Sequence, residues 1–137
     1  MSKKELDVQY VIEKLLYDLR ISRTYTGYKF VVYGLQAMMK DITLINHVYK
    51  GLYVVVGCKF GVSDKVVERD IRTIKKVVWR NNMMPEIFNG YETPPSNGEF
   101  MDLLLHEVER ILREAQEEED DEIVSVKEAI CTSMWNK

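Results

Sequence analysis

The chain has 137 residues, 46% of them hydrophobic and 30% charged, which is the composition of an ordinary globular protein with a buried core. Its longest apolar run, Leu52 to Cys58, is far shorter than the roughly 20 residues that a membrane-spanning helix needs, so we expect no membrane segment. The formal net charge of −3 argues against nucleic acid as a partner, but seven acidic and two basic residues lie in 115–137 and leave 1–114 slightly basic.

The first third of the chain carries apolar residues at helical spacing. Residues 5–20 are predicted to form a helix, and the break after it ends at Gly27. A second helix is expected over 28–41. Val31 and Val32 would tolerate a strand there, but the apolar residues that follow keep helical spacing, namely Leu35, Met38 and Met39. Residues 42–46 should add a short helical connector.

The next segment, 49–60, is predicted to be the first helix of a helix-turn-helix motif. Three consecutive valines at 54–56 favour a strand locally. Gly57 favours a helix, because two helices that approach closely leave room only for a small residue at their contact. Gly61 suits the turn, where a positive φ costs glycine little, and Ser63 can cap the helix that follows.

Residues 63–80 are predicted to form a long helix with two different faces. At about 100° per residue, one face collects basic residues: Lys65, Arg69, Arg72 and Lys76. The opposite face collects apolar residues: Val67, Ile71, Ile74 and Val78. A helix that is anchored by an apolar face and offers arginine and lysine on the other has the form of a DNA-recognition helix.

The last third begins with a loop and ends in an acidic segment. All three prolines lie in 81–95, where only a short helix at 85–88 is expected. Ser96 and Glu99 form a capping box ahead of a helix predicted over 97–114. The acidic run 117–122 should be solvated, and 123–135 should form either a short amphipathic helix or a mobile segment.

These elements predict an all-α fold of about six helices. We expect one compact domain over residues 1–114, which contains the helix-turn-helix, and an acidic extension over 115–137 that is partly helical. The N-terminus lacks the apolar segment of a secretory signal, and Cys58 and Cys131 are interpreted as reduced thiols. The expected location is therefore the cytoplasm, in association with the nucleoid.

The motifs of common catalytic sites are missing from the sequence. His106 to Arg110 superficially matches H-E-x-x-H, but Arg110 stands where the second histidine ligand belongs. No phosphate-binding loop and no nucleophile elbow occur, and nothing points to a base for Cys58. We therefore expect a protein that is not an enzyme and has no metal site or cofactor.

The basic face of the 63–80 helix suggests specific roles on double-stranded DNA. Arg69 and Arg72 are best able to bond bidentately to guanine. Lys65 and Lys76 are expected to meet phosphates. Glu68 could accept from cytosine or orient an arginine, and Thr73 could meet a thymine methyl or a phosphate. Lys75 and Arg80 lie beside this face and are expected to be solvated.

The motif V-E-R-x-I-R occurs here as Val67-Glu68-Arg69-Asp70-Ile71-Arg72, with Trp79 at the end of the same helix. Further pieces keep their order along the chain: Gly27-Tyr28-Lys29, Leu52-Tyr53 and Asn97-Gly98-Glu99-Phe100. Over about residues 7–113 the chain therefore resembles the family of Spo0A effector domains, which are the DNA-binding part of the response regulator of sporulation.

The resemblance implies a helix-turn-helix transcription regulator. Members bind repeated promoter boxes as a tandem dimer and activate or repress transcription. The resemblance would place DNA contacts on Glu68, Arg69 and Arg72, and it would place a contact with the RNA polymerase sigma subunit on residues 81–95.

The chain departs from the family pattern in three places. No receiver domain precedes the effector helices, so we expect a stand-alone member that phosphorylation does not control in cis. Val66 stands where an arginine is usual and Thr73 where a histidine is usual, so the preferred box is expected to differ or the affinity to be lower. The acidic extension is either a solvated tail or a segment that folds against the basic helix and weakens DNA binding.

Two functions remain open at this point. The first is a sequence-specific DNA-binding transcriptional regulator that acts as a dimer on DNA, for which the retained basic face argues. The second is an interaction protein that associates with a full-length Spo0A-like regulator, antagonises it and binds DNA weakly. Val66 and the acidic extension favour this second function.

Overall fold

The computed structural model describes residues 3–47, 51–81 and 90–135, and within these ranges it is helical without a strand. The elements are α1 (Lys3–Asp18), α2 (Thr26–Lys40), the 3₁₀ helix η1 (Ile42–His47), α3 (Tyr53–Phe60), α4 (Asp64–Asn81) and α5 (Asn97–Trp135). The all-α prediction is confirmed. The short helix expected at 85–88, like most of the 81–95 loop, lies outside the described residues.

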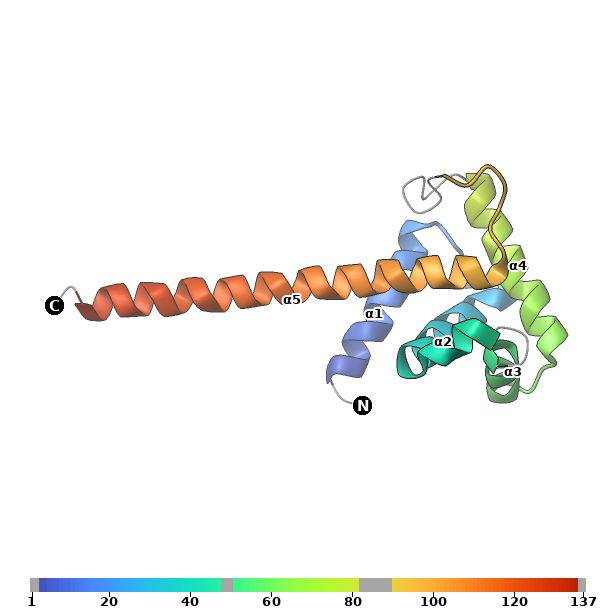
Figure 1. Ribbon diagram of the computed structural model, residues 1–137, viewed down its shortest axis with the longest axis horizontal. Helices are drawn as coiled ribbons and strands as arrows, with labels where there is room; N and C mark the ends of the chain where they lie inside the picture. Colours follow the sequence, from blue (N-terminus) through green and yellow to red (C-terminus); the bar gives the residue numbers. More distant parts are fainter. Residues whose placement is uncertain (1–2, 48–50, 82–89, 136–137) are drawn as a thin grey trace.

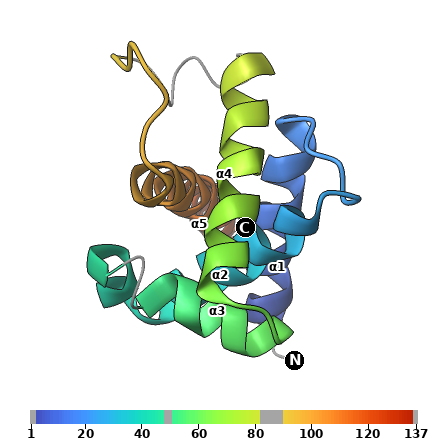
Figure 2. The same cartoon turned by 90° about the vertical axis from the view of Figure 1, so that its right-hand side faces the viewer.

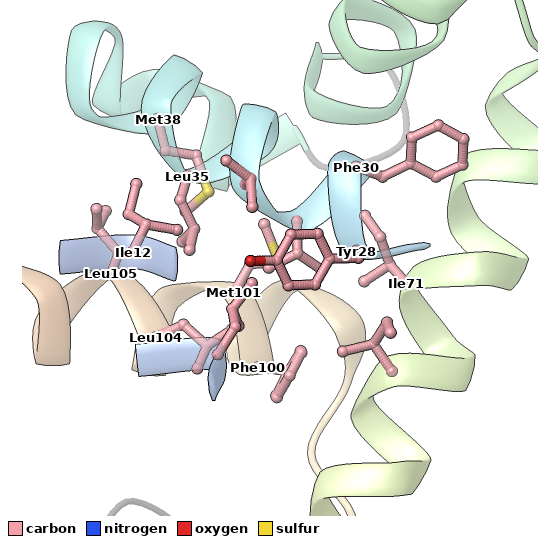
Figure 3. Packing of buried hydrophobic residues seen from close by; sticks show 14 of the residues in the cluster. Ile12, Tyr28, Phe30, Leu35, Met38, Ile71, Phe100, Met101, Leu104 and Leu105 are labelled. Atoms are coloured by element: carbon pink, nitrogen blue, oxygen red, sulfur yellow. The ribbon is translucent and has the colours of Figure 1, made fainter. Parts of the chain in front are cut away.

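Helix α2 is the centre of the molecule, because α1, α3, α4, α5 and η1 all pack against it. Figure 1 shows α1 to α4 gathered at one end of α5, and Figure 2, where α5 is seen almost end-on, shows α4 running along the outside of the group. The shared core is drawn in Figure 3 and includes Phe30, Leu35, Ile71, Phe100 and Leu104, each fully buried. None of the described helices is long and apolar enough to cross a membrane.

Helices α2 and α4 approach each other closely at Gly27. A Cβ atom added to Gly27 would lie 2.4 Å from the carbonyl oxygen of Asp70 and 2.9 Å from a side-chain carbon of Ile74. Only a residue without a side chain allows the first turn of α2 to lie against the middle of α4. From the sequence, Gly27 was expected only to end the segment between the first two helices. In the structure it sets the distance between α2 and α4.

The turn between α3 and α4 has the geometry that the sequence predicts. Gly61 ends α3 in the left-handed region with φ 68°, and the amide of Val62 donates to the carbonyl of Gly57 at 3.0 Å. A Cβ on Gly57 would lie 2.6 Å from the carbonyl oxygen of Val62, so a small residue is required there as predicted, but its close neighbour is the turn and not the second helix. The Ser63 hydroxyl accepts from the amide of Val66 at 3.3 Å and caps α4.

Helix α3 forms in spite of its three valines. Val56 is fully buried in the core, whereas Val54 is 44% exposed. The local preference of Val54–Val56 for a strand is overcome because the helical conformation brings Val56 and the buried Tyr53 to the same core-facing side, where burial stabilises them.

Helix α5 is much longer than the sequence analysis indicated. Its predicted end near Glu114 is wrong, because the helix continues without a break through the acidic run to Trp135. Between Glu99 and Trp135 the sequence has neither glycine nor proline, the residues that most often end a helix. Figure 1 shows the second half of α5 leaving the other helices behind and projecting away from them.

The first turn of α5 is fixed by Ser96 and Glu99. The Ser96 hydroxyl accepts from the Glu99 amide at 3.2 Å and donates to the Glu99 carboxylate at 3.1 Å, and the Tyr91 hydroxyl donates to the same carboxylate at 3.1 Å. The capping role predicted for Ser96 is confirmed. This cap also ties the end of the preceding loop to the helix.

Replacing Ser96 with alanine is expected to lower the free energy of unfolding by about 1 kcal/mol, because an amide of the first turn loses its acceptor. Urea unfolding followed by circular dichroism measures the change, with the exposed Thr93→Ala as a control that stays within about 0.5 kcal/mol of the wild type. A Ser96→Ala protein as stable as the control would contradict the capping role.

Candidate nucleic-acid interface

Helix α4 has one buried and one exposed face, as its sequence predicts. The apolar side chains Val67, Ile71, Ile74 and Val78 are all fully buried. On the opposite side the basic residues Lys65, Arg69, Arg72 and Lys76 are exposed. We call these four residues the basic face of α4. A face of this kind, carried by the second helix of a helix-turn-helix, can enter the major groove of DNA.

Neighbouring carboxylates hold the two arginines of the basic face. Nη1 of Arg72 donates to Oε1 of Glu68 at 2.7 Å, one helical turn away, and Nε of Arg69 donates to Oδ1 of Asp70 at 3.2 Å. The arginine side chains remain 44% and 63% exposed. Because each carboxylate takes one of the five N–H donors, each guanidinium keeps enough donors for the bidentate contact that recognises guanine. Glu68 thus contacts Arg72, one of the arginines that the sequence analysis expected it to orient.

Thr73 is exposed, but its hydroxyl is already used. Its Oγ1 donates to the carbonyl of Arg69 at 3.1 Å. The hydroxyl hydrogen is thus turned toward the helix, so the group offers DNA only its methyl and an acceptor lone pair. This geometry suits contact with a thymine methyl better than donation to a phosphate.

Val66 differs from the other candidates, because it is only partly exposed and packs against the hydrophobic core. An arginine at this position would present its charge beside Arg69, whereas valine extends the apolar anchor of the helix. Of the seven residues predicted to contact DNA, six are thus polar and reach solvent. The seventh, Val66, lies at their edge and packs against the core.

Lys75 does not have the solvated position expected for it. Its side chain is half-buried, and burial lowers the pKa of its ammonium group, an effect reinforced by the nearby charges of Arg72 and Lys76. The carboxylates of Glu68 and Glu99 act in the opposite direction. Lys75 therefore lies beside the basic face, near Arg72 and Lys76 of α4 and near Glu99 at the start of α5.

Asn97 is the residue of this site that the sequence analysis missed. It is buried, and its side-chain amide donates to the Tyr53 hydroxyl at 2.9 Å and to the carbonyl of Glu68 at 3.0 Å. One side chain thereby joins the start of α5 to α3 and α4 at the level of the basic face. Local sequence carries no signal for it, because both acceptors lie at least 29 residues away in the chain.

Asn97→Ala is expected to lower the free energy of unfolding by about 1–3 kcal/mol, since the buried Tyr53 hydroxyl and the partly buried carbonyl of Glu68 lose a donor. Asn97→Asp is the matched variant: it keeps the size of the side chain but cannot donate when ionised, so it should lose at least as much. Urea unfolding measures both. An aspartate variant as stable as the wild type would show that the amide donation contributes nothing.

The acidic extension makes no ion pair with α4 among the residues that the structure describes. Among the side chains that the structure describes on α5, the last basic residue in an ion pair is Arg110, which contacts Glu107 and Glu114. The extension then leads away from the basic face (Figure 1). The alternative in which it folds back on α4 of its own chain does not occur in this structure.

In the part of the chain that is described, no group of three or more His, Cys, Asp or Glu residues is placed to hold a metal ion.

Two comparisons with known proteins bear on this geometry. A family model described as "Sporulation initiation factor Spo0A C terminal" matches residues 12–115, which run from within α1 to the middle of α5 and include all of α2, η1, α3 and α4. No curated protein matches the chain.

Proposed function

We propose that this chain, which belongs to the family of Spo0A C-terminal domains, is a sequence-specific DNA-binding regulator of transcription. The family is one of helical DNA-binding effector domains and not a family of enzymes. The observation that carries the proposal is the pair of arginines on the exposed face of α4, each held by a carboxylate that takes only one of its five N–H donors.

The residues of the basic face have separate roles in this proposal. Arg69 and Arg72 read guanine bases through bidentate hydrogen bonds, and Glu68 fixes the direction of Arg72. Lys65 and Lys76 contact phosphates at the two ends of the face. Thr73 contacts a thymine methyl. Val66 reads no base, so the box that this chain prefers is less tightly specified on that side.

Three further features belong to the proposal. The protein acts in the cytoplasm on the nucleoid, it binds DNA as a dimer, and residues 81–95 contact the sigma subunit of RNA polymerase. These features rest on the family and on the position of the loop directly after α4.

Selection of bound duplexes from a random pool tests the proposal. We expect enrichment of one short box that contains guanine, with an affinity at physiological salt at least about 1,000-fold above that for unrelated duplex. Measurements at two salt concentrations separate this preference from general attraction to phosphate, which falls steeply with salt for any basic protein. A pool that stays random after selection would rule out sequence-specific binding.

The second candidate function is an antagonist that associates with a full-length Spo0A-like regulator and binds DNA weakly. It is favoured by the apolar Val66 at the edge of the basic face and by the exposed second half of α5, which offers a surface for protein contact. The same selection separates the two functions, because an antagonist of this kind enriches no box on its own.

A further inference from the structure

The second half of α5 is exposed to solvent along the side chains that the structure describes. We call residues 113–135 the free half of α5. Every residue whose side chain is described there is exposed, and between Arg113 and Ile130 the chain has eight acidic and two basic residues. Like charges lie one turn apart, as in Glu117 and Asp121, and such pairs destabilise an isolated helix. A cationic partner would relieve this repulsion.

One side of the free half also carries an apolar row. Ile123, Val126 and Ile130 are 52%, 58% and 54% exposed, and their spacing of three and four residues places them on one side of the helix. Toward the N-terminus the same side continues with Glu122 and Glu119. This side therefore changes along the helix from acidic to apolar, a pattern that fits a partner surface that changes from basic to apolar.

Helix α4 and the turn before it have such a surface. Arg72, Arg69 and Lys65 follow one another at intervals of three and four residues, toward the N-terminus of α4. Just beyond Lys65, an open hollow of about 540 Å³ lies between α3 and α4, lined by Val54, Gly57, Cys58, Gly61, Val62 and Asp64. Val54, which lines the hollow, is 44% exposed.

The two surfaces match in spacing when the helices run antiparallel. Glu119, Glu122 and Val126 are separated by three and four residues, as are Arg72, Arg69 and Lys65. Glu119 then lies opposite Arg72 and Glu122 opposite Arg69. Val126 lies opposite Lys65, whose aliphatic stem it can contact, and Ile130 reaches the hollow. Antiparallel packing also places the helix dipoles in their favourable arrangement.

The free half cannot reach α4 of its own chain. It is continuous with the first half of α5, which is buried against α1 and α2, and it points away from α4 (Figure 1). With no glycine or proline after Gly98, a bend would have to break several helical hydrogen bonds. The surface that it fits is therefore available to it only on another molecule.

We propose that the free half of α5 docks on the basic face of α4 in a second copy of this chain. Two copies that do so reciprocally form a closed pair in which both basic faces are covered. The docking uses the face to which the proposed function assigns DNA, so a docked copy and DNA exclude each other. Free protein would be held off DNA until DNA, with its higher charge density, displaces the partner helix.

Two complementary variants test the docking without DNA, so that its failure is distinguishable from failure of the proposed function. Arg69→Ala/Arg72→Ala keeps the free half of α5 intact but removes two charges from the basic face on which it docks. Glu119→Gln/Glu122→Gln keeps the basic face intact but removes the acidic contacts of the free half. By sedimentation equilibrium at low salt, each variant alone should self-associate at least about tenfold more weakly than the wild type. Their mixture, with one variant labelled, should form a 1:1 complex through the single intact contact.

The matched control is Glu117→Gln/Asp121→Asn, which removes the same charge from the opposite side of the free half. It should self-associate like the wild type, and circular dichroism checks that each variant keeps its helix content. Association that survives in both test variants would mean that the free halves pair with each other, and it would overturn the proposal. A control variant whose self-association weakens as much as that of Glu119→Gln/Glu122→Gln would also overturn it. The same holds for a mixture of the two test variants that stays monomeric, and for a wild-type chain that is monomeric at high concentration.

Discussion

Alanine at Arg69 or Arg72 is expected to weaken binding to the selected box by roughly 1–3 kcal/mol, or about five- to 150-fold for each arginine. Both guanidinium groups keep enough N–H donors for a bidentate contact, so each substitution removes one such contact. Affinity for unrelated duplex should fall much less, since only one phosphate-attracting charge is lost. Fluorescence anisotropy with both duplexes at fixed salt measures the two losses.

Lysine at the same positions separates base recognition from charge. Arg69→Lys keeps the positive charge but cannot bond bidentately, so it should lose preference for the box while its salt dependence stays that of the wild type. Arg113→Ala, on α5, removes the same charge as Arg69→Ala but outside the basic face, and it should change the ratio of the two affinities little. If Arg69→Lys retained the full preference for the box, direct readout by this arginine would be excluded.

Gly27→Ala is expected to lower the free energy of unfolding by about 3 kcal/mol. Helix propensity alone predicts the opposite sign, because alanine is more favourable than glycine within a helix by about 1 kcal/mol. The close approach decides the outcome: the new Cβ would lie 2.4 Å from the carbonyl oxygen of Asp70, a backbone atom that can move only if α2 and α4 separate. Urea unfolding gives the change directly.

Gly34→Ala is the matched control in the same helix. Its Cβ would lie 3.0 Å from the terminal carbon of Met101 and at ordinary contact distance from Leu52 and Val56. The methionine side chain can change conformation, so we expect a change within about 1 kcal/mol of zero. Equal losses at Gly27 and Gly34 would show that the α2–α4 approach is no tighter than the rest of the core.

The sequence predicts the helix-turn-helix well because its signals are local. Gly57, Gly61 and Ser63 each act within five residues of their own position, through a close contact, a positive φ and a cap. The two faces of α4 follow from its periodicity alone. In all these cases the structure is determined by residues that are close together in the chain, so the sequence pattern is sufficient to predict it.

The features that the sequence analysis missed have causes that are distant or weak. Asn97 is significant only through Tyr53 and Glu68, which folding brings to it from other helices. The surroundings of Lys75 likewise include Glu99, which lies 24 residues further along the chain, at the start of α5. The end of α5 was misplaced because like charges oppose a helix only weakly, by a few tenths of a kcal/mol for each pair, and no breaking residue follows them.

The length of α5 has a consequence for how the molecule behaves in solution. Its 39 residues span about 58 Å at 1.5 Å per residue, although the chain has a mass of only 16.1 kDa. A rod of this length attached to a small globular body increases friction, so a monomer should elute from a gel-filtration column as if it were considerably heavier. Oligomeric state must therefore be read from light scattering or sedimentation equilibrium, which report mass independently of shape.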